Sequence, residues 1–226
     1  GRGRSFPSSW QMRATGSSKG YLRVLNTLWY YLVLPCTSSD SYSLAEAFFP
    51  DKSLLELTLT EKPNEKWLTD VTEFKWYEGM EVRKLYLSAI LDLCDRRIVS
   101  YVLSEHNDNP LVYKTFDKAV KANPNAHPLF HSDRGFQYTS RTFHHKLVQA
   151  GMTQSMSRVA HCIDNGPMEG FWGILKRERY YGRRFTCKQE LIQTIEQYIR
   201  YYNTRRVQRN LGVLTPMEKH RLYLAA

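Results

Sequence analysis

The sequence predicts an α/β sandwich built on a mixed β-sheet. This prediction rests on the order of the apolar segments: three strand-like runs come first, and helical and strand-like segments then alternate. Of the 226 residues, 42% are hydrophobic and 24% are charged. That composition is enough to bury the core of one ordinary domain, with an additional segment beside it.

Three strands are expected at the start of the regular part of the chain. Residues 67–76 mix aromatic, β-branched and polar side chains, and residues 82–93 form a long apolar run that suits a strand buried on both faces. Residues 98–103 form the third strand. The short link from Cys94 to Arg97 predicts that the second and third strands pair as an antiparallel hairpin.

Helices and short strands follow in alternation. A helix is expected over residues 109–122, because proline suits a first helical turn and an Asn-Pro pair follows the last residue. A strand is expected over 129–132 and a helix over 140–151, with Ser140 as its N-cap. A last strand is expected over 152–156.

Two further helices complete the pattern. The first is expected to be capped by Asp164 and Asn165, and the second to begin with a capping box formed by Thr186 and Gln189. The second is the basic helix of the C-terminal part. Its apolar face is expected to consist of Leu191, Ile192, Ile195, Ile199 and Tyr202.

Residues 1–60 differ in character from the rest of the chain. They contain ten serines and little periodicity, so they stay an unassigned N-terminal segment. Disorder, truncation and translation out of frame are open interpretations of this segment. The regular domain is expected at residues 61–222.

The surplus of positive charge indicates a polyanionic partner. The net charge is +10 and the pI about 9.4, which favours nucleic acid or an anionic membrane as the partner. Residues 176–209 hold ten Lys or Arg against three Glu, with tyrosines interleaved, as suits a surface that follows a DNA backbone. The alternative is a solvated helix face with its tyrosines in the core. We expect DNA contacts from Arg183, Arg184, Arg205 and Arg206.

Two other classes of protein are not supported. No stretch reaches the roughly 18 apolar residues that a membrane span needs, so we expect a cytoplasmic protein that does not enter the membrane. The four cysteines are far apart and form no C-x-x-C pair, which argues against a zinc finger and against a disulfide scaffold.

Three acidic residues form the candidate site. Asp70 lies inside a predicted strand, Asp133 at a strand exit and Glu169 in the first turns of a helix, with 35 residues between the last two. Phosphoryl transfer on DNA needs hard cations, which carboxylates converging from such positions can hold. Singly, each acid has an ordinary explanation, as a strand-edge acid, a turn former or a helix-dipole partner. Asp92 is a rival ligand that we interpret as structural.

Three sequence motifs around these acids resemble those of a known family. They are PNEKWLTD at Pro63–Asp70, HSDRGFQY at His131–Tyr138 and DNGPMEGF at Asp164–Phe171. With this spacing they resemble the OrfB-type transposases of bacterial insertion sequences, whose catalytic core is related to retroviral integrase. The word LGVLTPME at Leu211–Glu218 resembles the same family, so that the resemblance covers roughly residues 60–222.

The resemblance implies a ribonuclease-H-like fold, with a mixed five-stranded sheet flanked by helices. It also implies a DDE-type transposase that nicks DNA and joins the freed 3′-hydroxyl to a new phosphodiester, during DNA integration and recombination. In such an enzyme Asp70, Asp133 and Glu169 would hold two Mg²⁺ or Mn²⁺ ions. Lys176, seven residues after Glu169 and so on the same helix face, would contact the phosphate backbone.

The N-terminal segment departs from the family pattern. Residues 1–60 do not resemble the helix-turn-helix region that family members carry ahead of the core. The resemblance therefore implies a fused or separate helix-turn-helix partner, and a multimer on DNA. Two alternatives stay open: a nuclease of the same fold that cuts without joining, and a non-catalytic DNA-binding remnant.

Overall fold

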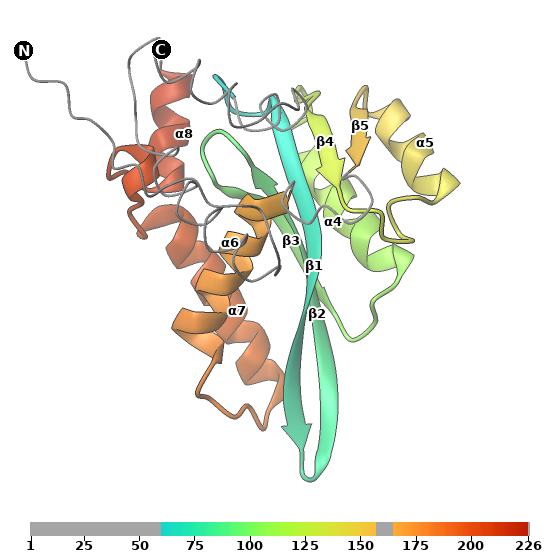
Figure 1. Ribbon diagram of the computed structural model, residues 1–226, viewed down its shortest axis with the longest axis vertical. Coiled ribbons are helices and arrows are strands. Elements are labelled where there is room, and N and C mark those ends of the chain that lie inside the picture. Colours follow the sequence, from blue (N-terminus) through green and yellow to red (C-terminus); the bar gives the residue numbers. More distant parts are fainter. Residues whose placement is uncertain (1–59, 157–164, 226) are drawn as a thin grey trace, which may run out of the picture. The chain divides into compact units, whose positions relative to one another are not determined.

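A computed structural model describes residues 60–156 and 165–225, which belong to one compact unit. They form a five-stranded sheet in the order β3-β2-β1-β4-β5, with helices on both faces (Figure 1). β1, β2 and β3 pair antiparallel, whereas β4 pairs parallel with both β1 and β5. The predicted α/β fold with a mixed five-stranded sheet is confirmed. The strands are β1 (Lys66–Glu78), β2 (Glu81–Asp92), β3 (Ile98–Ser104), β4 (Leu129–Ser132) and β5 (Thr153–Met156).

The helices divide into two layers, one on each face of the sheet (Figure 1). α4 (Asn109–Ala122) and α5 (Arg141–Gln149) cover one face, and α6 (Gly166–Leu175) and α7 (Lys188–Thr204) cover the other. None of the helices in this described part combines the length and apolar character that a membrane span requires. Three shorter elements complete the C-terminal part: η3 (Lys176–Tyr180), η4 (Arg209–Leu211) and α8 (Pro216–Leu224).

The alternation of side chains along β1 decides which face each residue serves. Trp67 is fully buried in the cluster under α4 and α5, whereas its neighbour Leu68 is buried in the cluster under α6 and α7. Because successive strand residues point to opposite faces, Asp70 lies on the same face as Leu68. Asp70 therefore points to the side of the sheet that α6 covers.

Of two predicted helix starts, that of α7 is wrong in detail and that of α6 is right in position. α7 begins after Cys187, one residue later than a box at Thr186 requires, so Gln189 falls at the second helical position, where it cannot close a capping box. The capping box that the structure does contain is formed by Thr215 and Glu218, at the start of the unpredicted α8. Asn165 stands at the N-cap of α6 but makes no side-chain cap bond, and Asp164 lies outside the described residues.

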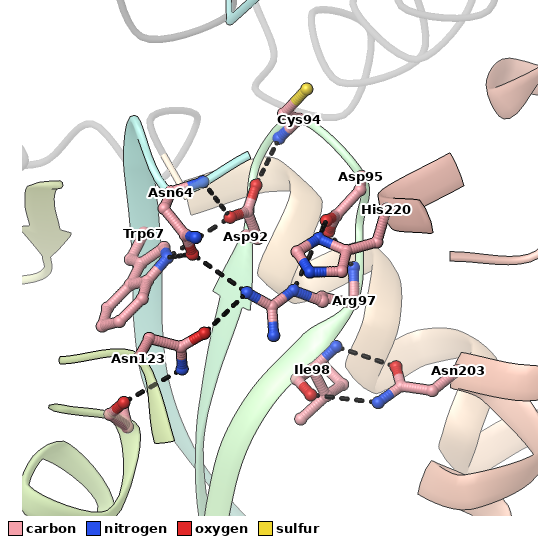
Figure 2. A network of polar contacts seen from close by, with 11 residues as sticks. Asn64, Trp67, Asp92, Cys94, Asp95, Arg97, Ile98, Asn123, Asn203 and His220 are labelled. Atoms are coloured by element: carbon pink, nitrogen blue, oxygen red, sulfur yellow. Dashed lines mark hydrogen bonds and ion pairs between the residues drawn. The ribbon is translucent and has the colours of Figure 1, made fainter. Parts of the chain in front are cut away.

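A buried carboxylate, Asp92, joins the ends of β1 and β2. It accepts hydrogen bonds from the backbone N–H of Asn64 at 2.6 Å and of Cys94 at 2.9 Å, and from the indole N–H of Trp67 at 3.3 Å (Figure 2). Burial raises its pKa to about 6, and the negative charge of Asp95 adds to the rise. With its oxygens engaged in this way, Asp92 has the structural role that the sequence suggested.

A second buried carboxylate, Asp95, joins α8 to the turn between β2 and β3. Its Oδ2 lies 2.7 Å from Nδ1 of His220 in α8 and 3.4 Å from Nε of Arg97. The Nη2 of Arg97 donates in turn to the side-chain oxygens of Asn64 and Asn123 (Figure 2). Residues from four separate segments of the chain therefore share one buried polar network.

Removing the charge at the centre of this network should destabilise the protein strongly. In Asp95→Ala the Arg97 guanidinium stays buried without its counter-charge, and we expect a loss of about 3 kcal/mol in the free energy of unfolding. Urea denaturation followed by circular dichroism measures it. The matched control is Asp117→Ala, which breaks the exposed ion pair with Lys146 and should cost less than about 1 kcal/mol. Equal losses in the two variants would contradict the central role of Asp95.

Candidate active site

The register of the two central parallel strands brings Asp70 and Asp133 together. β1 pairs with β4 over only three residue pairs, and the last pair is Leu68 with His131. Continued by two residues, this register sets Asp133 beside Asp70, on the neighbouring strand end and the same face of the sheet. Asp133 is exposed just past the end of β4, whereas Asp70 is half-buried inside β1.

Glu169 comes to the same face of the sheet from the opposite direction. It lies in the first turn of α6, the helix that lies against β1 (Figure 1). The apolar face of α6 is anchored by Met168, Phe171 and Leu175, each at most 1% exposed. That anchoring leaves Glu169 at the exposed edge of the helix, and burial raises the pKa of its carboxyl above the ordinary value.

Asp70 is held in a setting that disfavours its charge. Burial raises its pKa from the ordinary 3.8 to about 6, while a hydrogen bond from the indole N–H of Trp172 at 3.0 Å opposes the rise. The charges of Asp133 and Glu169 raise the pKa further by repulsion. Both of the other predicted acids therefore act electrostatically on Asp70.

Asp133 combines a local role with a free oxygen. Its Oδ1 accepts a hydrogen bond from the backbone N–H of Gly135 at 2.9 Å, which is the turn-forming contact that the sequence offered as an alternative explanation. A side chain at Gly135 would bring its Cβ to 3.0 Å from that same oxygen, so any larger residue would crowd the Asp133 carboxylate. Among the described residues, no hydrogen bond engages Oδ2 of Asp133, which leaves that oxygen for a ligand.

The donor set suits a hard divalent cation, although the acids do not close around one position. All three side chains offer carboxylate oxygen, the ligand that Mg²⁺ and Mn²⁺ prefer. A bound cation would offset the repulsion that Asp133 and Glu169 exert on Asp70. Within residues 60–156 and 165–225, however, no three His, Cys, Asp or Glu side chains converge closely enough to hold one metal ion. Joint coordination by Asp70, Asp133 and Glu169 thus stays a prediction.

Lys176 follows α6 directly, on the side of Phe74 in β1. Its Nζ lies 5.2 Å from the centre of the Phe74 ring. Burial lowers the pKa of this ammonium, while the charges of Glu73 and Asp70 oppose that change. Lys176 forms no ion pair with another described residue, so its charge is available to an external anion.

The four arginines expected to contact DNA lie in two separate places. Arg183 and Arg184 precede α7, where Arg183 pairs with Glu190 at 3.1 Å and Arg184 stacks 4.4 Å over the ring of Tyr77. Arg205 and Arg206 follow α7, whose 17 residues separate the two pairs by about 25 Å. The first pair lies near Tyr77, about 23 Å along β1 from Asp70. The basic stretch is therefore not one continuous patch.

Of these arginines, Arg206 makes the most extensive ion pair within the protein. Its guanidinium donates from Nε and Nη2 to the carboxylate of Glu178, at 2.8 Å for the shorter contact. Arg205 is exposed and has no side-chain partner among the described residues. The DNA contacts of all four remain predictions, and Arg206 would have to leave Glu178 or share it.

Three residues of the site were not identified from the sequence. Trp172 donates to Asp70, Asn165 donates through Nδ2 to the backbone oxygen of Thr69 at 3.3 Å, and the buried Tyr138 hydroxyl lies 3.3 Å from Oγ1 of Thr69. No local signal indicated these contacts, because each joins residues at least 69 positions apart in the chain. Nδ1 of the buried His131 lies 3.0 Å from Oγ of Ser155 in β5.

Solved structures with a similar fold include an integrase catalytic core domain. The HTLV-2 integrase catalytic core domain in complex with magnesium superposes with a TM-score of 0.54 at 20% identity, over 70% of this chain and 97% of that one. A chain of the simian T-cell lymphotropic virus intasome in complex with PP2A regulatory subunit B56 gamma gives 0.59 at 19% identity, over 70% and 55%. The fold is thus that of a retroviral integrase catalytic core.

Sequence comparisons narrow this class to a family. Two family models described as integrase core domain match residues 60–162 and 169–222. The putative transposase InsK of insertion sequence element IS150 from Escherichia coli is 45% identical over 158 residues, which are 70% of this chain and 54% of that protein. A transposase-like protein of Haemophilus influenzae is 44% identical over 156 residues, 69% of this chain and 70% of that one. The chain belongs to the family of insertion-sequence transposases with an integrase core domain.

The chain matches only part of the length of these relatives. The matched part of the chain spans about half the length of the IS150 relative, and 56% of the Shigella sonnei protein of insertion element IS600. Family membership therefore applies to the core described above.

The raised pKa of Asp70 gives a testable dependence of stability on pH. Between about pH 4 and pH 6 the folded protein keeps the Asp70 proton and the unfolded chain loses it, so stability rises as the pH falls through 6. Above pH 6 the ionised group destabilises the fold. We expect Asp70→Asn to gain about 2 kcal/mol at pH 7 in EDTA, and to show a flatter pH dependence.

Thermal or urea unfolding at pH 5 and pH 7 measures this effect. The pKa of Asp92 is also raised to about 6, and Asp92 is present in both proteins. Its contribution to the pH dependence of stability is therefore the same in both, and the difference between the two proteins reports on Asp70. If the Asp70→Asn variant is less stable than the unmodified protein at pH 7, the ionised Asp70 carboxylate does not destabilise the fold and this inference is wrong.

Proposed function

We propose that this chain is the catalytic part of a DNA transposase, which nicks DNA strands and joins the freed 3′ ends to new phosphodiesters. The observation that carries the proposal is the register of β1 and β4, which sets Asp133 beside Asp70 on the face that α6 covers with Glu169. Magnesium in the HTLV-2 integrase core supports a divalent metal here as well. Asp70, Asp133 and Glu169 are the residues that would hold two Mg²⁺ or Mn²⁺ ions.

Bound in this way, two hard cations would activate the attacking oxygen and stabilise the leaving one during phosphoryl transfer. The protein's own contribution is to keep carboxylates ready on a rigid sheet. Asp70 is fixed by its strand and by Trp172, and Asp133 is fixed by the turn at Gly135. Glu169 lies on a helix whose apolar face is buried against the sheet, so packing holds its backbone in place.

Positively charged side chains outside the group of three acids would bind the phosphate backbone of the nucleic acid. Lys176 lies on the Asp70 side of η3 and is not paired with a described carboxylate, which suits a contact to a phosphate near the reacting bond. Arg183 and Arg184 beside the β1–β2 hairpin, and Arg205 and Arg206 at the far end of α7, suit contacts further along the duplex.

A longer assembly is part of the proposal. The matched relative of IS150 is nearly twice as long as the matched region, and the intasome chain belongs to an assembly. We propose that this core acts with a helix-turn-helix segment, fused or separate, that recognises the element ends. Two DNA ends must be held together for joining, so the active form would be a multimer on DNA.

One observation favours a second candidate function, a non-catalytic DNA-binding remnant. Within the described residues the three acids do not converge tightly enough to hold one metal ion. A remnant would bind DNA through the same basic residues without cutting it. A nuclease of the same fold would cut DNA without joining it, so product analysis separates all three.

Loss of one acid should abolish the chemistry and spare the fold. We expect Asp133→Asn to lower the rate of DNA joining on the order of a thousandfold, because a metal-stabilised transition state loses several kcal/mol. The assay uses Mg²⁺ and duplexes with the free 3′-hydroxyl ends of the insertion sequence. The control is Asp117→Asn, an exposed acid of α4 on the opposite face, which should join at the unmodified rate.

The products distinguish the candidates. Joined products from the unmodified protein and from Asp117→Asn, but not from Asp133→Asn, support the transposase. Nicked but unjoined products would indicate a nuclease, and equal DNA binding without cutting in all three proteins would indicate a remnant.

Removing the Lys176 charge should change the salt dependence of DNA binding. If Lys176 contacts one phosphate, Lys176→Ala lowers the slope of log Kd against log salt by about 0.9. Fluorescence anisotropy over a salt series measures the slope. Lys146→Ala is the control, because Lys146 lies in α5 on the opposite face and pairs with Asp117. A slope unchanged from the unmodified protein would remove Lys176 from the DNA-binding surface.

A further inference from the structure

The indole of Trp172 contacts one of the proposed metal-binding acids directly. Its Nε1–H donates a hydrogen bond to Oδ2 of Asp70 at 3.0 Å. Trp172 is only 6% exposed, so water competes weakly for that donor. A hydrogen bond to an ionised carboxylate is stronger than one between neutral groups, and this one fixes which oxygen of Asp70 faces the protein.

The same helix is tied to the same strand at the preceding residue. Asn165, at the start of α6, donates through Nδ2 to the backbone oxygen of Thr69 at 3.3 Å. Two consecutive residues of β1 are therefore bound by side chains of one helix. Glu169 lies between the two donors, one turn before Trp172 and on the same helix face. The contacts that hold Asp70 thus also set the position of Glu169 relative to it.

A second tryptophan shows that this hydrogen bond is not a general need of the core. Trp76 belongs to the same hydrophobic cluster and is 7% exposed, nearly the same as Trp172. Yet its Nε1–H has no hydrogen-bond partner within the described part of the chain. The core therefore buries an indole N–H without a partner, and packing alone does not account for the contact between Trp172 and Asp70.

We propose that Trp172 is a positioning residue for the metal-binding carboxylates. By engaging Oδ2 of Asp70 it leaves Oδ1 for the ion, and it fixes the spacing between Asp70 and Glu169. This role rests on the proposed function, since it assumes that these acids hold a divalent cation. Ligating carboxylates are commonly oriented by such outer hydrogen bonds, and their removal weakens metal binding ten- to a hundredfold.

The test compares two matched substitutions, Trp172→Phe and Trp76→Phe. Each removes an indole N–H from the same cluster and keeps an aromatic ring, but only the first removes a donor to Asp70. Calorimetry with Mn²⁺ on the metal-free full chain measures binding without DNA. We expect the Kd for Mn²⁺ to rise about ten- to a hundredfold in Trp172→Phe and to stay unchanged in Trp76→Phe.

A DNA-joining assay gives an independent readout of the same role. The Mn²⁺ concentration for half-maximal joining should rise by the same factor in Trp172→Phe, while the rate at saturating Mn²⁺ falls less. A purely structural defect would lower the maximal rate and leave the metal requirement unchanged.

A third variant, Trp172→His, separates hydrogen bonding from packing. The Nε2–H of histidine occupies the ring position that corresponds to Nε1 of tryptophan, so this variant keeps a donor and loses apolar volume. Positioning predicts tighter Mn²⁺ binding by Trp172→His than by Trp172→Phe, and the reverse order would overturn it. If Trp172→Phe does not fold, Trp172→His decides alone: affinity close to that of the unmodified protein supports the role, and loss of binding refutes it.

The experiments distinguish a failure of the positioning role of Trp172 from a failure of the proposed transposase function. If the unmodified protein binds Mn²⁺ and joins DNA, but Trp172→Phe matches it in Mn²⁺ affinity, only the positioning role is overturned. If the unmodified protein neither binds Mn²⁺ nor joins DNA, the proposed function fails and the positioning role fails with it.

Discussion

The site depends on where the parallel pairing of β1 and β4 ends. β1 pairs with β2 from Trp67 to Glu78, but it pairs with β4 only from Lys66 to Leu68. The ladder with β4 ends at Leu68, so the edge of β1 that faces β4 is open at Asp70. A carboxylate in mid-strand is costly when it has no partner, and this opening gives Asp70 access to a ligand. Asp133 reaches the same opening because its strand ends one residue before it.

α6 converts this opening into a site with three acids. The helix packs on the sheet through large apolar side chains, and polar contacts to Thr69 and Asp70 set its position along β1. Glu169, almost one hundred residues away from Asp70 in the chain, is placed by this packing. The rigidity of the arrangement therefore comes from the sheet and the core, while the chemistry comes from residues at their edge.

The sequence predicted the sheet well because its strands are read from local patterns. The run at 82–93 and the link at Cys94–Arg97 contain their own evidence for a buried strand and a hairpin. The three acids could be identified from the sequence because each lies in a distinctive motif. By contrast, α8 carries a weak apolar pattern, with only Pro216 fully buried, so its periodicity gave no signal.

Other features of the site are tertiary and have no local signature. The bond from Trp172 to Asp70 joins residues 102 positions apart, and the sequence shows Trp172 only as one more apolar residue of a helix. The charge count over 176–209 was correct, but it could not show that α7 separates Arg184 from Arg205. Likewise, the partnership of Arg206 with Glu178 follows from the turn at η3, which local propensity did not reveal.

The most direct measurement of the central claim is a crystal structure of the full chain with Mn²⁺, located by anomalous scattering. The account predicts a manganese peak about 2.1 Å from oxygens of both Asp70 and Asp133, with Glu169 turned towards the same cluster. Manganese bound elsewhere on the protein, with these two carboxylates left uncoordinated, would contradict the shared site.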